Sequence, residues 1–133
     1  MEGVTLGMNY GLRRLEELGV KPKQIRATGG GANSKVWRQI MADIFKAEVV
    51  TLNVSEGAAY GAALQALWCW RVQQGEKISL PEITDEFVQL NRAGTAHPNA
   101  KNVALYHELQ SLQDELSQSL RGVFARHRRF LSE

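Results

Sequence analysis

Three consecutive glycines (Gly29-Gly30-Gly31) follow a short strand-like segment and precede a strongly amphipathic one. Residues 24–28 have the length and composition of a buried strand that enters a tight turn. Residues 34–45 carry apolar side chains at helical spacing, and Asn33 or Ser34 is placed to cap that helix. The sequence therefore predicts a strand, a glycine turn and a helix in this order.

A glycine turn at a helix N-terminus has well-defined chemistry. Glycine adopts positive φ without strain, its missing Cβ lets a ligand touch the backbone, and the helix dipole presents free N–H groups to anions. Adenosine or a phosphate group would suit such a turn. The alternative is a plain strand-to-helix connection in which glycine only relieves strain, and the local pattern leaves both readings open. The turn matches neither the P-loop pattern GxxxxGK[ST] nor the Rossmann pattern GxGxxG, which argues against both of these sites.

Hydrophobic spacing predicts further elements along the chain: a helix over residues 4–18, a strand over 48–52, a helix over 56–73 capped by Ser55 and a final helix from Ala100. Between the last two helices, Pro81, Gly94 and Pro98 predict an irregular connection over 76–99. The order helix-strand-helix-strand-helix, followed by a C-terminal helix, predicts an α/β fold with parallel strands. Residues 1–75 would form the core and residues 100–133 the C-terminal helix. Two strands rarely stand alone, so we expect the rest of the sheet to lie outside this chain.

Composition narrows the possible partners. The 16 basic and 14 acidic side chains nearly balance and create no strong field for a polyanion, so nucleic acid is not an expected partner. Cys69 is the only cysteine, and its place between Trp68 and Trp70 predicts a buried, inert thiol. No apolar run reaches the roughly 18 residues of a spanning helix, so no membrane partner is expected. The three histidines lack metal-ligand spacing and are expected at the surface. These features predict a cytoplasmic protein without a metal site of its own.

Three stretches of the sequence resemble the C-terminal end of the FGGY carbohydrate kinases, and most closely the xylulose kinases among them. The stretches are Glu2-Gly3-Val4, residues 25–44 (IRATGGGANSKVWRQIMADI) and residues 55–64 (SEGAAYGAAL). A looser similarity continues through residues 102–106. The resemblance covers nearly all of the chain but only the last part of such a kinase.

The resemblance implies a fold and a set of binding residues. The fold would be a fragment of the C-terminal, actin-like ATPase (ribonuclease H-like) domain of a sugar kinase. Such an enzyme transfers the γ-phosphoryl group of ATP to a sugar hydroxyl with Mg²⁺ present. The resemblance implies that Gly29-Gly30-Gly31 lie against the adenosine, with Asn33, Ser34 and Trp37 as the other nucleotide-binding candidates.

The catalytic aspartate, the sugar pocket and the phosphate-binding loops of that family would all lie upstream of Met1. Phosphoryl transfer depends on positioning both substrates and stabilising charge, so we expect the isolated chain to be inactive and the full-length protein to phosphorylate D-xylulose. Uncovered strand edges and apolar surfaces lead us to expect self-association. The competing hypothesis is a non-catalytic helical interaction or oligomerisation module, in which residues 100–128 pair with a partner chain and the glycine turn stays empty.

Overall fold

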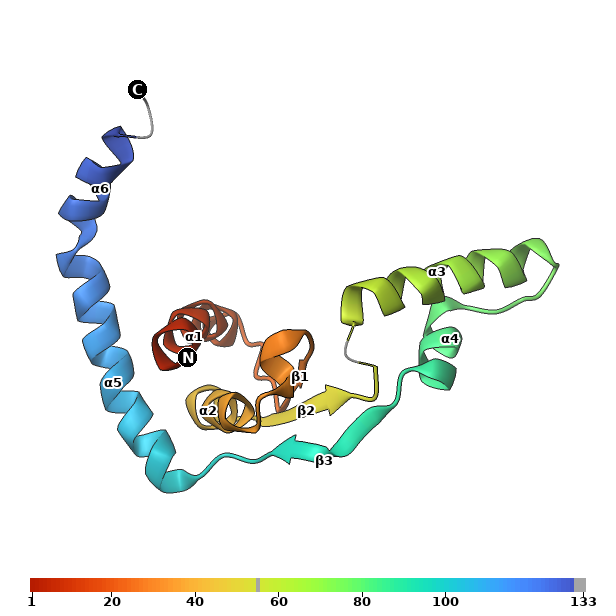
Figure 1. Cartoon of the computed structure of the whole chain (residues 1–133), viewed down its shortest axis with the longest axis horizontal. Helices are drawn as coiled ribbons and strands as arrows, with labels where there is room; N and C mark the ends of the chain where they lie inside the picture. The colour runs from red at the N-terminus through yellow and green to blue at the C-terminus, as the bar shows by residue number, and fades with distance from the viewer. Residues whose placement is uncertain (55, 131–133) are drawn as a thin grey trace.

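The computed structural model describes residues 1–54 and 56–130. Its elements follow in this order: α1 (Glu2–Glu17), β1 (Gln24–Ala27), the 3₁₀ turn η1 (Gly30–Asn33), α2 (Lys35–Phe45), β2 (Glu48–Leu52), α3 (Gly57–Gln73), α4 (Leu80–Phe87), β3 (Leu90–Ala96), α5 (Ala100–Ser119) and α6 (Arg121–Arg129). Figure 1 shows a body made of α1, α2 and the sheet, from which α3 and α4 project on one side and α6 on the other. None of the described helices is long and apolar enough to cross a membrane.

The sheet has three strands in the order β1-β2-β3. β1 runs parallel to β2, with Ile25 opposite Val49. β3 runs antiparallel to β2, and an irregularity in the register lies between Val49 and Thr51. In the part of the chain that the structure describes, β1 pairs only with β2, so its other edge offers unpaired backbone groups. Three strands are still fewer than the roughly four to six of a typical sheet.

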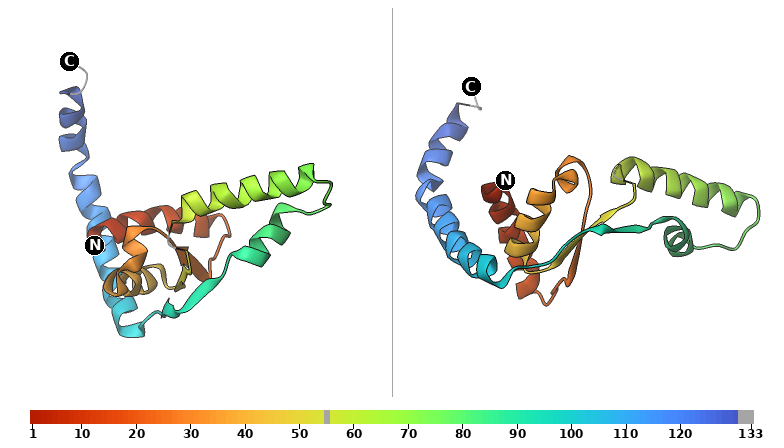
Figure 2. Two further views of the ribbon diagram at one scale, coloured as in Figure 1. Left: turned by 45° about the vertical axis from the view of Figure 1, so that its right-hand side comes forward. Right: turned by 60° about the horizontal axis from the view of Figure 1, so that its bottom comes forward.

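Helix α2 is the centre of the body, because α1, α5 and β3 all contact it. The views in Figure 2 show α1 and α2 side by side, with the first part of α5 crossing beside them. Apolar spacing along α2 places one of its sides in the core. The buried core residues come from six parts of the chain: Leu6, Met41, Ala42, Ile44, Phe45, Ala47, Val49, Ala96 and Tyr106.

The segment 76–99 differs from the irregular connection expected from its prolines and glycine, because it contains α4 and β3. Pro81 lies in the first turn of α4, where a proline lacks no hydrogen bond, and Ser79 begins a capping box at this end. Gly94 lies within β3, where an added Cβ would be 2.9 Å from the Thr51 hydroxyl oxygen. Both supposed breakers are therefore compatible with regular structure here.

Helices α3 and α4 pack against each other, away from the core. The Tyr60 hydroxyl donates to the carbonyl oxygen of Phe87 over 2.8 Å, and Trp68 Nε1 donates to the carbonyl oxygen of Ile78 over 2.8 Å. Cys69 is exposed and Trp70 is 56% exposed, so the expectation of a buried thiol was wrong. The physical reason is that α3 is apolar on several sides but packs mainly on α4.

The predicted final helix is divided in two. α5 ends at Ser119 and α6 begins at Arg121, and Leu120 between them keeps right-handed helical dihedrals (φ −82°, ψ −4°). Gly122, a poor helix former, lies at the start of α6. The backbone stays helical across the junction, but the arm bends there, as Figure 1 shows. The other predicted helix cap, Ser55, lies outside the described residues.

Candidate functional site

The glycine turn lies at the carboxyl end of β1. Because β1 and β2 are parallel, the carboxyl end of β2 lies at the same edge of the sheet, and the chain continues from it towards α3. The start of α3 lies close to the end of β1, since a Cβ added at Gly57 would lie 3.1 Å from the Thr28 side chain. Ligands of open parallel α/β sheets bind outside the carboxyl ends of the strands. The turn therefore occupies the position where a ligand is expected.

The three glycines have different surroundings. Gly29 has φ 79°, a value that strains any residue with a Cβ. A Cβ added at Gly31 would lie 2.9 Å from the Trp37 ring carbon Cζ3. A Cβ added at Gly30 would meet no atom within 4 Å, and its φ is not in the left-handed region. Gly29 and Gly30 are both exposed, so the backbone of this turn is open to an incoming molecule.

The turn itself is a short 3₁₀ helix. The Ala32 N–H donates to the Gly29 carbonyl oxygen over 3.0 Å, and the Ser34 N–H donates to the Gly31 carbonyl oxygen over 3.2 Å. Ser34 Oγ then accepts the Trp37 N–H over 3.2 Å, which makes Ser34 the N-cap of α2. Of the two candidate caps, Ser34 is confirmed. Asn33 ends the 3₁₀ turn with an exposed side chain beside the open backbone.

The Trp37 indole fills the space between the turn and α1. Its ring lies against Gly31, and its Nε1 donates to Thr5 Oγ1 over 2.9 Å. Thr5 is fully buried, and its hydroxyl in turn donates to the Met1 carbonyl oxygen over 3.0 Å. The ring and its polar nitrogen are thus both engaged within the protein. This arrangement allows Trp37 to hold the turn in place.

Arg38, the next residue of α2, also contacts the turn and was not singled out from the sequence. Its Nη1 donates to the Ala32 carbonyl oxygen, inside the 3₁₀ turn. Gly94 of β3 lies beside the guanidinium group, because a Cβ added there would be 3.8 Å from Arg38 Cζ. In the described residues the buried Arg38 Nε has no hydrogen-bond partner. No local sequence signal shows this role, because it depends on how the turn folds back towards α2.

The ionisable side chain of Tyr106 links α5 to α1 at the core. The Tyr106 hydroxyl donates to Glu2 Oε1 over 2.7 Å, and burial together with this hydrogen bond raises the pKa of Tyr106 to about 12. His97, His107 and His127 are exposed, as predicted. Residues 1–54 and 56–130 contain no group of three or more His, Cys, Asp or Glu side chains able to hold a metal ion.

Comparisons with known proteins agree with this architecture. The profile of the FGGY family of carbohydrate kinases, C-terminal domain, matches residues 1–70. A xylulose kinase of Haemophilus influenzae is 41% identical over 106 residues, which are 80% of this chain and 20% of the relative. A gluconokinase of Bacillus licheniformis is 35% identical over 112 residues, again 20% of its length. The crystal structure of xylulose kinase from Rhodospirillum rubrum superposes with a TM-score of 0.72 at 26% identity, covering 93% of this chain and 24% of that one.

The fold is therefore a fragment of the C-terminal, actin-like domain of a sugar kinase. The chain belongs to the FGGY family of carbohydrate kinases, and it is xylulose kinase-like within that family. It spans about one fifth of the length of the relatives that it matches.

Proposed function

We propose that this chain is the nucleotide-binding portion of an ATP-dependent carbohydrate kinase and that Gly29-Gly30-Gly31 contact the adenosine of ATP. Gly30 carries the argument. Positive φ explains why residue 29 is a glycine, and the indole of Trp37 explains residue 31. Neither reason applies to Gly30, which is exposed and has room for a side chain. A ligand that approaches the backbone does require a glycine at this position.

The neighbouring residues have different parts in this proposal. The exposed amide of Asn33 is free in orientation to reach a ribose or base, and Ser34 fixes the first turn of α2. The open N-terminus of α2 adds a partial positive charge near a bound nucleotide. Trp37 and Arg38 both contact the turn. The adenosine end of ATP thus fits the residues present.

The reaction belongs to the longer protein of which such a domain is part. Its relatives bear the names xylulose kinase and gluconokinase, and the higher identity to a xylulose kinase makes D-xylulose the proposed substrate. In that setting, ATP with Mg²⁺ supplies the phosphoryl group. The described residues bring together no carboxylate cluster for Mg²⁺, so we assign no metal-binding step to this chain. The free cysteine fits a reducing compartment, and we place the enzyme in the cytoplasm.

The isolated chain is proposed to lack sugar phosphorylation. Catalysis of phosphoryl transfer requires a base for the sugar hydroxyl and groups that stabilise charge at the γ-phosphate. We assign neither of these groups to the described part of the chain. A coupled ADP-release assay with D-xylulose and with gluconate checks this, and turnover of about one per second or faster with either sugar would contradict it.

Two matched variants test the nucleotide role. Gly30→Leu fills the open space above the turn, whereas Gly11→Leu adds the same side chain to an exposed, equally open position on α1. Calorimetric titration with ADP should show an affinity loss of about tenfold or more in the first variant and none in the second. Gly30→Leu should keep the thermal midpoint of the parent, and Gly11→Leu should keep or raise it, because it replaces a glycine inside helix α1. Equal affinity in the two variants would count against the turn as the binding site.

The second candidate function is the helical interaction module. One observation favours it: α5 and α6 expose several large apolar side chains that no described residue covers. This surface is compatible with the kinase assignment, and it leads to a separate inference.

A further inference from the structure

One continuous apolar stripe runs along the outside of α5 and α6. We call it the outer stripe, and its members are 45% to 80% exposed: Leu105, Leu112, Leu116, Val123 and Phe130. Their separations are seven, four, seven and seven residues, which keep them on one side of a helix. Leu120 preserves helical dihedrals between α5 and α6, so the stripe continues across the junction.

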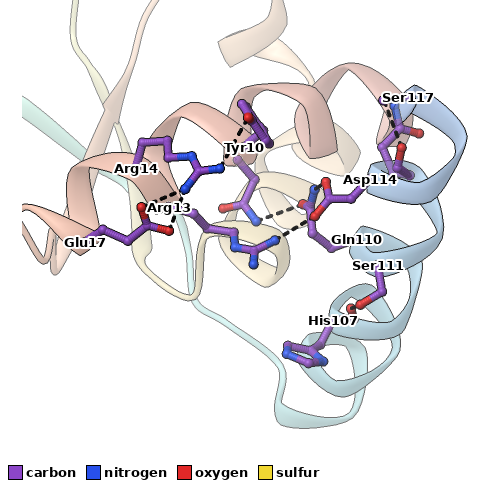
Figure 3. A network of polar contacts seen from close by, with 11 residues as sticks. Tyr10, Arg13, Arg14, Glu17, His107, Gln110, Ser111, Asp114 and Ser117 are labelled. Atoms are coloured by element: carbon purple, nitrogen blue, oxygen red, sulfur yellow. Dashed lines mark hydrogen bonds and ion pairs between the residues drawn. The ribbon is translucent and has the colours of Figure 1, made fainter. Parts of the chain in front are cut away.

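The outer stripe faces away from the rest of the molecule. The opposite side of α5 contacts α1 through polar pairs, with Asn9 Nδ2 donating to Gln110 Oε1 over 2.9 Å and Arg13 Nη1 to Asp114 Oδ2 over 2.9 Å. Figure 3 shows Gln110 and Asp114 directed towards α1. Leu112 lies two residues from both, which is about 200° around the helix. A cavity lies between α1 and α5, and Arg13, Gln110 and Asp114 are among its lining residues. The stripe residues do not line this cavity.

Charges beside the stripe change sign along its length. Glu108 and Glu115 flank it in α5, whereas Arg126 and Arg129 flank it near the end of α6. All four side chains are exposed. Two parallel copies would place like charges together, which is destabilising. Two antiparallel copies place the acidic part of each helix against the basic part of the other.

We propose that the outer stripe is a homodimerisation surface on which the α5–α6 arm of a second copy packs antiparallel. One register pairs four of the five stripe residues with each other and brings opposite charges together. It places Leu105 opposite Phe130 of the second copy, Leu112 opposite Val123, and Glu108 near Arg126 and Arg129. The two-fold axis then passes between Ser117 and Gln118 on each arm, close to the α5–α6 junction, and Leu116 lies opposite Ser119. This inference is independent of the nucleotide-binding role of the glycine turn.

The size of the surface sets the strength of the dimer. Ten stripe side chains that each bury on the order of 100 Å² would remove about 1,000 Å² from water, near the lower limit for a specific interface. The dimer should therefore be weak, with dissociation in the micromolar range or above. Its population should depend on protein concentration.

Sedimentation velocity of the full 133-residue chain tests the surface. Between about 5 and 200 μM the weight-average mass should rise from 14.8 kDa towards twice that value. Leu112→Glu should weaken dimerisation tenfold or more, and Ser111→Glu, which adds the same charge to an exposed position off the stripe and away from the two-fold axis, should leave it unchanged. Leu112 is 60% exposed, so the first variant should fold. A monomer at every concentration would overturn the proposal. A dimer that Leu112→Glu leaves intact would also overturn it, and would point to another surface, such as the unpaired edge of β1.

Cysteine cross-linking tests the orientation. In a Cys69→Ser background, an equimolar mixture of Leu112→Cys and Val123→Cys chains should form a mixed disulfide dimer under mild oxidation, while Leu112→Cys alone should remain mostly uncross-linked. Efficient cross-linking of Leu112→Cys with itself would overturn the antiparallel arrangement.

Charge exchange tests the proposed pairing of Glu108 with Arg126. Glu108→Arg and Arg126→Glu should each weaken the dimer, and the chain that carries both changes should dimerise as the parent does. Absence of this restoration would contradict the proposed charge pairing.

Discussion

Trp37 Nε1 lies 2.9 Å from the hydroxyl oxygen of Thr5, and this hydrogen bond ties the helix after the glycine turn to the first helix of the chain. The same indole packs on Gly31. The shape of the turn therefore depends on α1 as well as on the local sequence. A change in this contact should alter both the stability of the domain and the position of the turn.

Trp37→Phe removes the N–H donor and also shortens the ring that lies against Gly31. The Thr5 hydroxyl then loses one of its two hydrogen bonds inside the protein, and the free energy of unfolding should fall by about 1–2 kcal/mol. Urea denaturation followed by circular dichroism measures this. Trp70→Phe, at an exposed tryptophan, is the control and should change the stability by less than about 0.5 kcal/mol. An equal loss in both variants would show that the Thr5 contact is unimportant.

Asp43 joins α2 to the start of α5. The carboxylate is 2% exposed and accepts hydrogen bonds from the Asn99 N–H (2.7 Å), from Gln39 Nε2 (2.9 Å) and from Asn102 Nδ2 (2.9 Å). Asp43→Asn places an NH₂ group among these donors and should reduce the free energy of unfolding by about 2–3 kcal/mol. Limited proteolysis should then cut near residue 99 sooner. Asp85→Asn, on the exposed side of α4, should leave both measurements unchanged.

Arg38 should affect nucleotide binding through the turn. Arg38→Met removes the hydrogen bond to the Ala32 carbonyl oxygen but preserves much of the aliphatic packing. Since the loosened turn must be ordered again when a ligand binds, ADP affinity should fall about three- to tenfold. Arg38→Lys retains one donor and should recover part of the loss. If calorimetry gives the parent affinity for both variants, the turn does not depend on Arg38.

Tyr106 makes the stability depend on pH in the alkaline range. Its pKa is about 12 in the folded protein, above the usual 10 of the unfolded chain. Below pH 10 the phenol is neutral in both states, so its contribution to stability is complete. As the pH rises from about 10 through 12, only the unfolded state releases the proton readily and this contribution is lost. Urea midpoints at pH 9 and pH 11 should therefore differ more in the parent than in Tyr106→Phe, and equal differences would contradict the assignment.

Patterns along the chain predicted the elements around the glycine turn well. β1, α2, β2 and α3 begin and end within a few residues of their expected positions, because hydrophobic period and capping residues act locally. α4 and β3 were missed for a shared reason. Pro81 and Gly94 were read as breakers, yet the first is in a helix's first turn and the second makes room for Thr51. Only the three-dimensional contact explains the glycine in β3.

The candidate site was predicted in part. Ser34 is recognisable as a cap from its place before an apolar helical run. The separate reasons for Gly29 and Gly31 are not visible in the sequence, because one is a backbone angle and the other a contact with Trp37. Arg38 looked like an ordinary residue on the polar side of α2. Its hydrogen bond to the Ala32 carbonyl oxygen becomes apparent only in the folded turn.

The most direct test of the central proposal is a titration of the ¹⁵N-labelled chain with ADP, followed residue by residue by amide chemical shifts. Millimolar ADP should shift the amide signals of Gly29, Gly30 and the residues through Ser34 most strongly, with saturation on one binding curve. The amide of Gly11, on exposed α1, should stay in place. Absence of shifts at the turn, or larger shifts only on α5 and α6, would contradict the assignment of Gly29-Gly30-Gly31 as the adenosine contact.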